Sequence, residues 1–137
     1  MIKLYFLLVA FFAMGDALAG EVIVIGNSKL DKLEVVTIQK LYTGKLIRVN
    51  GIDMTAVNIK SGALRDQFLS SFLNQSDEKY SAYWAIRLFA GKGMPPVEFK
   101  SVAEVIKYVQ NNSGAIGYIN EDDLIPEVRV VARPSGD

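Results

Sequence analysis

The chain has 137 residues, enough for one domain, with 15 basic and 15 acidic side chains and therefore no formal net charge. This balance excludes the broad basic surface that holds nucleic acid. The sequence contains no histidine and no cysteine, which excludes a Ser-His-Asp site, a disulfide framework and most zinc sites. No convincing pair of carboxylates is present either, so we expect neither an enzyme, nor a metal site, nor a cofactor.

Residues 1–19 have the pattern of a secretory signal peptide. Lys3 supplies a positive charge, residues 4–14 form an apolar run too short to span a bilayer comfortably, and residues 17–19 form an A-x-A cleavage site. An uncleaved anchor is the alternative. We expect cleavage after Ala19, a single domain over residues 20–137, and a periplasmic location, where a domain without disulfides depends on its packing.

The first expected element of the domain is a strand over residues 21–26, EVIVIG. Its β-branched residues would be apolar on both faces, which is typical of a strand inside a sheet. Asn27 and Ser28 follow directly. Open α/β sheets bind ligands at the carboxyl ends of their strands, so this pair is a candidate part of a ligand site. An ordinary polar turn is the alternative interpretation.

A short helix is expected next, with Thr37 as its N-cap and Gly44 as the left-handed residue that ends it. Residues 45–53 read as a polar loop that turns at Asn50 and Gly51.

Residues 54–73 form the stretch that carries the ligand hypothesis. They predict a short strand, a polar turn over residues 58–62 and an amphipathic helix whose apolar residues recur at helical spacing. Ser61 stands at the expected N-cap, and Gly62 allows a ligand to approach the backbone.

The start of this helix has the chemistry of an anion site. Its first-turn N–H groups lack intrahelical partners and lie at the positive end of the helix dipole. Lys60, Ser61 and Arg65 suit a phosphate-like oxyanion. The alternative is that Ser61 only caps the helix and that Asp66 satisfies the dipole without a ligand.

Two further helices are expected. The first begins after a Ser76 cap and carries an aromatic stripe, which core packing explains better than a binding face; its members are Tyr80, Tyr83, Trp84, Leu88 and Phe89. The second opens with a capping box from Ser101 to Glu104.

The chain then predicts two more strands. One covers residues 115–119, where the internal Gly117 implies close approach by another element. The other, at residues 127–132, alternates as an edge strand does. Strands and helices in this order predict a three-layer α/β/α domain with a mostly parallel or mixed sheet.

Several motifs in this order resemble the substrate-binding proteins of phosphate ABC transporters, which have the type II periplasmic binding protein fold. Residues 37–45, TIQKLYTGK, are similar to the family's helix that ends in F/Y-x-G-K, and Ser61-Gly62 is similar to the start of its Ser-Gly-Thr phosphate loop. Residues 83–96 fit its YW, F-x-G-x-G and P-P pattern, and residues 113–119, SGAIGYI, match its S-G-A-I-G-Y strand.

The resemblance implies a non-catalytic lobe that binds phosphate through the Ser61 hydroxyl and the N–H groups of Gly62 and Ala63. We add Arg65, because helical side chains lean toward the helix N-terminus. Two departures stand out. Ala63 replaces the threonine of the family's loop, and the chain has room for one of the two lobes that close over the anion.

Two functions follow from these observations. The first is periplasmic binding of phosphate or a similar anion, linked to a membrane transporter or sensor. The second is an accessory protein with a degenerate ligand site, whose exposed face binds a partner protein or a second copy of the chain.

Overall fold

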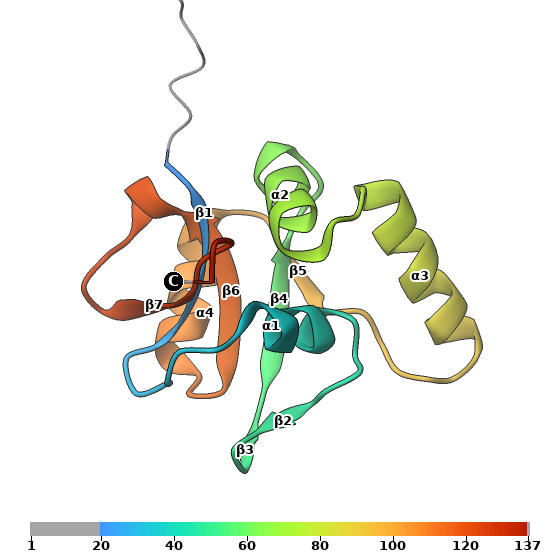
Figure 1. The fold of residues 1–137 in the computed structure, drawn as a ribbon, viewed down its shortest axis with the longest axis horizontal. Helices are drawn as coiled ribbons and strands as arrows, with labels where there is room; N and C mark the ends of the chain where they lie inside the picture. The colour runs from blue at the N-terminus through green and yellow to red at the C-terminus, as the bar shows by residue number, and fades with distance from the viewer. Residues whose placement is uncertain (1–19, 137) are drawn as a thin grey trace, which may run out of the picture.

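A five-stranded mixed sheet organises residues 20–136, the part of the chain that this computed structural model describes (Figure 1). The predicted signal peptide, residues 1–19, lies outside these residues. The spatial strand order is β5-β4-β6-β1-β7. Strand β4 is parallel to both β5 and β6, whereas β1 is antiparallel to both β6 and β7, so β1 runs against the other strands. The strands are β1 (Val22–Asn27), β4 (Thr55–Ile59), β5 (Val97–Phe99), β6 (Ala115–Asn120) and β7 (Val128–Ala132).

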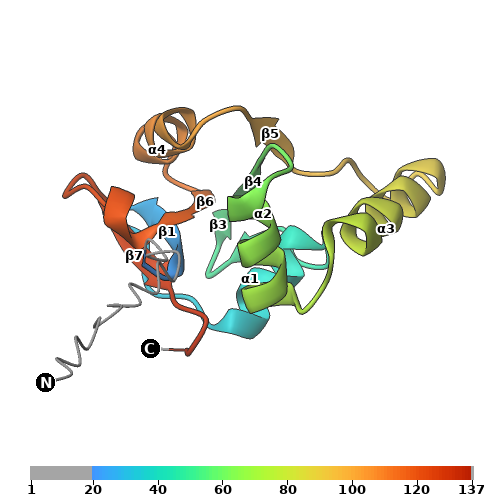
Figure 2. The same ribbon diagram turned by 90° about the horizontal axis from the view of Figure 1, so that it is seen from above.

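Helices cover both faces of this sheet, which confirms the predicted three-layer α/β/α architecture (Figure 2). One face carries α1 (Val35–Tyr42), α2 (Ala63–Phe68) and the π-helical turn η1 (Leu69–Leu73) that continues α2. The opposite face carries α4 (Val102–Asn111). Helix α3 (Asp77–Phe89) projects beyond the β5 edge of the sheet, and the 3-10 turn η2 (Glu121–Asp123) precedes β7.

Alternating residues of β1 supply both layers of the core. Val22 and Val24 pack with α1 and α2, whereas Ile23 and Ile25 pack with α4. This is why the first strand is apolar on both faces, as an interior strand must be. The predicted close approach at Gly117 is confirmed, because a Cβ there would lie 2.5 Å from a methyl carbon of Val105 on α4.

The structure contains three short strands that the sequence does not predict. The expected polar loop is partly a hairpin of β2 (Arg48–Val49) and β3 (Ile52–Asp53). Its turn falls at the predicted dipeptide, where Asn50 and Gly51 have φ of 50° and 80°, the left-handed values that a two-residue hairpin favours. The third is β5, which follows two prolines.

The predicted helix ends are partly confirmed. Gly44 has the expected left-handed φ of 71°, and the Ser76 and Ser101 hydroxyls accept N–H bonds at the starts of α3 and α4. The Thr37 cap is wrong, because α1 begins at Val35 and the preceding Glu34 makes no side-chain cap.

Core packing of the α3 aromatic stripe is confirmed for only part of it. Tyr80 and Trp84 are buried, and their side chains donate to the carbonyl of Tyr42 at 2.9 and 3.1 Å. Leu88 and Phe89 are exposed, because the end of α3 extends past the sheet.

Candidate anion-binding site

The helix at the centre of the ligand hypothesis begins one residue later than a Ser61 cap requires. Helix α2 starts at Ala63, its N-cap is Gly62, and no side chain caps it. The predicted Ser61 cap is therefore wrong. The first helical bond of this turn runs from the Asp66 N–H to the Gly62 carbonyl at 3.0 Å.

The missing cap leaves the start of α2 with unused donors. Among residues 20–136, no acceptor receives a bond from the backbone N–H of Gly62, Ala63 or Leu64. The approach is open, because a Cβ on Gly62 would meet only the Lys60 carbonyl oxygen, at 4.0 Å. Exposed N–H groups at the positive end of a helix attract an anion.

Ser61 directs its hydroxyl toward the start of the next helix. Its Oγ donates to Oδ2 of Asp77, the first residue of α3, at 2.7 Å. This hydrogen bond is the main cause that lowers the pKa of Asp77 below its ordinary value of 3.8, and the positive charge of Arg65 lowers it further. Ser61 thus links the α2 turn to a carboxylate that stays ionised.

Arg65 is buried at the base of the same cluster. Its side chain is 4% exposed, and its Nε and Nη1 donate to Asp77 Oδ1 at 2.9 Å and to Glu98 Oε1 at 2.6 Å. Nη1 also donates to the carbonyl of Ile59 at 3.3 Å, and the guanidinium lies 5.5 Å from the centre of the Tyr80 ring. Two carboxylates therefore balance its charge, and the side chain joins α2 to α3 and β5.

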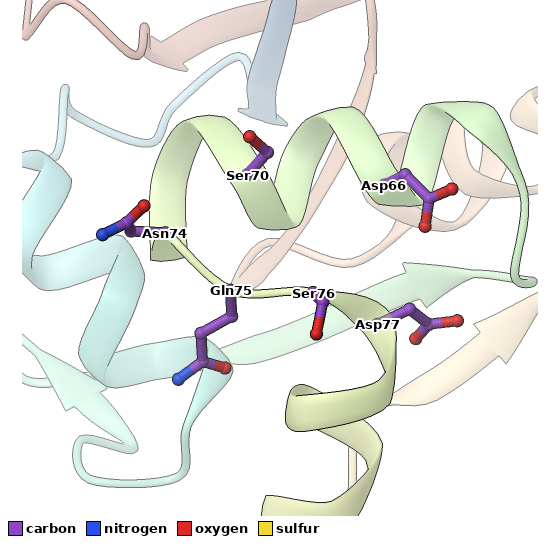
Figure 3. A pocket seen from close by; sticks show the side chains of 6 residues that line it. All are labelled: Asp66, Ser70, Asn74, Gln75, Ser76 and Asp77. Carbon is purple, nitrogen blue, oxygen red and sulfur yellow. The ribbon is translucent and has the colours of Figure 1, made fainter.

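A polar groove lies between the α2–η1 helix and the start of α3 (Figure 3). Its volume is about 540 Å³. Figure 3 shows Asp66 and Asp77 together at one end of the groove. Since its charged side chains are acidic, the groove itself does not suit an anion. The residues that line it are Asp66, Ser70, Asn74, Gln75, Ser76 and Asp77.

Asn27 and Ser28 do not belong to this cluster. Because β1 runs against β4 and β6, its carboxyl end lies at the opposite end of the sheet from Ser61. There the Asn27 amide donates to the Gln110 carbonyl at 3.1 Å, and its oxygen accepts from the Lys29 N–H in a local turn. Asn27 and Ser28 do lie at the carboxyl end of a strand, as expected, but in a mixed sheet the carboxyl ends of antiparallel strands lie at opposite ends.

Two charged side chains of this cluster, Asp77 and Glu98, are not among the candidate residues found from the sequence. Asp77 follows the Ser76 cap at the start of α3, and Glu98 lies in the unpredicted β5. Within residues 20–136, no three potential ligands gather as a metal site would require. In the same range, every helix is too short or too polar to cross a membrane.

Comparison with known proteins identifies the fold. No family model matches the chain, and no curated protein matches its sequence. The structure is similar to an ABC-type phosphate transport receptor from Vibrio cholerae, at 15% identity and a TM-score of 0.64 over 85% of this chain and 47% of that one. It is also similar to a putative phosphate ABC transporter substrate-binding protein with bound phosphate from Clostridium perfringens, at 21% identity and a TM-score of 0.63 over 82% of this chain and 44% of that one.

PstS from Borrelia burgdorferi is a third structural neighbour, at 19% identity and a TM-score of 0.53 over 72% of this chain and 40% of that one. The chain spans less than half the length of each of these proteins. It has the fold of a single lobe of a phosphate-transport substrate-binding protein, as the sequence motifs predict.

Proposed function

We propose that this protein is a non-catalytic periplasmic binding lobe that takes phosphate or a closely similar oxyanion at the start of α2. The observation that carries the proposal is the uncapped helix start, where the N–H groups of Gly62, Ala63 and Leu64 have no acceptor among the described residues. In this proposal the Ser61 hydroxyl turns from Asp77 to the ligand, and Lys60 adds positive charge from an exposed position.

Arg65 acts in this proposal beneath the ligand. A side chain that is 4% exposed and holds two carboxylates cannot also form a forked contact with an anion in the same geometry. Its guanidinium instead fixes the distance between the α2 turn and Asp77. The charge of Arg65 offsets that of Asp77, which lies beside the proposed anion.

The Asp77 carboxylate also influences which anion the proposed site binds. Ser61 places it 2.7 Å from a hydroxyl that would contact the ligand. A carboxylate repels a fully ionised anion, but it accepts a hydrogen bond from an anion that retains a proton. Phosphate retains a proton near neutral pH and sulfate does not, so we propose that the site prefers phosphate.

Similarity to phosphate receptors supports this function and a periplasmic location, and a membrane transporter or sensor is the partner class that we propose.

Thermal unfolding with phosphate, with sulfate as comparison, tests the proposal. Phosphate at about a hundred times its dissociation constant is expected to add roughly 2.7 kcal/mol, a rise of several degrees in Tm. Ser61→Ala should abolish most of that rise, whereas Ser71→Ala, at an exposed serine of η1, should keep it. The absence of a phosphate-specific rise, or an equal rise in Ser61→Ala, would contradict the site.

A further inference from the structure

Gly20, the residue at the start of the described chain, is bonded to the turn that follows β6 (Figure 1). Its backbone N–H donates to Oδ2 of Asp122, in the turn η2, at 3.1 Å, and its carbonyl accepts from the side-chain amide of Asn120 at 2.9 Å. One residue later, the Glu21 carbonyl accepts from the Glu121 N–H at 2.9 Å. Three hydrogen bonds therefore attach the residues before β1 to the end of β6 and to η2.

The backbone of Gly20 lies directly against this acidic turn. A Cβ at this position would lie 3.3 Å from the Cβ of Glu121 and 3.4 Å from Oδ1 of Asp122. The same residue is the expected first residue of the mature chain, since the predicted cleavage site ends at Ala19. The structure therefore places the expected new chain end beside a carboxylate.

That carboxylate has no basic side chain as its partner. Arg133 Nη1 pairs with Glu121 at 2.8 Å and with Glu21 at 3.4 Å. Among residues 20–136, however, no lysine or arginine forms an ion pair with Asp122, whose side chain accepts from the neutral N–H of Gly20. A charged donor at the same atom would form a shorter and stronger hydrogen bond with the carboxylate.

Cleavage after Ala19 would supply this charge. A signal peptidase adds water across the Ala19–Gly20 peptide bond, which leaves a carboxylate on Ala19 and an α-amino group on Gly20. The α-amino group is protonated and positively charged at neutral pH. The Gly20 nitrogen then carries three donors and a positive charge in place of one neutral N–H.

We infer that the α-ammonium group of Gly20, which signal-peptide cleavage creates, forms an ion pair with Asp122 and fastens the start of β1 to η2 in the mature protein. Removal of the signal peptide then stabilises the domain. Asp122 is exposed, so the gain is modest, as it is for most ion pairs near a protein surface. The inference rests on the predicted cleavage site and is independent of the proposed anion site.

Intact mass and urea unfolding of the exported protein test the ion pair. The mass is expected to correspond to a chain that begins at Gly20. In that chain, Asp122→Asn should raise the unfolding equilibrium constant about threefold at low salt, because the amide keeps an acceptor but loses the charge. Most of this difference should disappear in 1 M NaCl, where the screening length falls to about 3 Å.

Two matched controls isolate the ammonium group. Acetylation of the Gly20 α-amino group keeps an N–H and removes the positive charge, so Asp122→Asn should have almost no effect in the acetylated chain. Asp123→Asn removes a neighbouring charge of η2 from a side chain that has no hydrogen bond or ion pair with another described residue. This substitution should leave the stability nearly unchanged.

Three results would overturn the inference. The first is a mature chain that begins at a residue other than Gly20. The second is an equal cost of Asp122→Asn in the free and acetylated chains, and the third is a cost of Asp123→Asn as large as that of Asp122→Asn, which would point to the overall charge of the turn. None of these measurements involves phosphate, so failure of the proposed anion site would leave them unaffected.

Discussion

Ser61, Arg65, Asp77 and Glu98 form one connected cluster, although they come from a loop, two helices and an edge strand. The buried guanidinium depends on its two carboxylates, because an unpaired charge at this depth is costly. Glu98 makes the shorter contact with Arg65, at 2.6 Å, whereas Asp77 is the less exposed of the two carboxylates and also accepts a hydrogen bond from Ser61. Asp77 therefore affects three properties: the pairing of Arg65, the dependence of stability on pH, and the proposed ligand site.

Asp77 is expected to make stability dependent on acid pH. Folding lowers the pKa of its carboxyl below 3.8, so its contribution is fully present above that value and is lost as pH falls through the lower, folded-state pKa. Asp77→Asn should cost about 2 kcal/mol at neutral pH, the scale of a hydrogen bond to a charged group, and the difference from the unchanged protein should shrink below pH 4.

Urea unfolding between pH 2.5 and 7 measures this effect. Asp66→Asn is the matched control, because Asp66 lies at the same end of the polar groove but its side chain has no hydrogen bond or ion pair with another described residue. A constant difference between Asp77→Asn and the unchanged protein across this range would show that the carboxylate is not coupled to folding.

For individual residues, the sequence indicates which side chains belong to the candidate site better than it indicates how they are arranged. Ser61 and Arg65 are found from helix spacing and side-chain type, and both lie in the cluster. Spacing cannot show that Arg65 faces two carboxylates from distant segments, since these contacts form only when α3 and β5 assemble around α2. Asn27 is misplaced for a related reason, because a local pattern does not reveal the direction of its strand.

The packing of α4 against β6 depends on the absence of a side chain at Gly117. Gly117 lets α4 approach, because a Cβ would lie 2.5 Å from a methyl carbon of Val105 and 3.2 Å from one of Val57. Those neighbours sit on α4 and β4, so a side chain at this position would push two elements apart.

Gly117→Ala is expected to destabilise the protein by about 1–3 kcal/mol, the usual cost of overpacking a core. The measurement is urea unfolding, with Gly91→Ala as a second variant. A Cβ at Gly91 would have no described atom within 4 Å, but the φ of this residue is 69°, so its substitution reports backbone strain without overpacking. Combining Gly117→Ala with Val105→Ala should recover part of the loss, and no recovery would mean that the clash is not the cause.

Element length explains which elements the sequence predicts. The long helices and the apolar strands β1 and β6 carry periodicity and capping signals that agree with the fold. The strands β2, β3 and β5 have only two or three residues, too few for an alternating pattern. Their pairing depends on the hairpin turn and on the neighbouring strand β4.

The whole molecule has two hydrophobic layers that share a single sheet. Tyr118 and Ile119 point from adjacent positions of β6 into opposite layers. Because the same strands contribute side chains to both layers, we expect the two layers to unfold together. Helix α3 is joined to this body by Trp84 and Tyr80, which donate to the end of α1.

We therefore expect the described residues to unfold in one transition, with an enthalpy of about 80 kcal/mol near 60 °C. Trp84 is the only tryptophan of the chain, so its fluorescence reports α3, whereas far-ultraviolet circular dichroism reports the whole fold. The two melting curves should coincide at one protein concentration. An earlier fluorescence transition would instead identify α3 as a separately unfolding unit.

The reversed strand β1 has a consequence for the order in which the chain can fold. Its partners, β6 and β7, lie near the other end of the described chain, with Val22 opposite Asn120 and Asn27 opposite Val128. During synthesis, β1 emerges early and stays unpaired until almost all later residues have followed. Until then its apolar side chains are exposed to non-native contacts. We therefore expect folding to begin with local contacts around β4 and α2, and β1 to pair late, with β7 joining the sheet beside it.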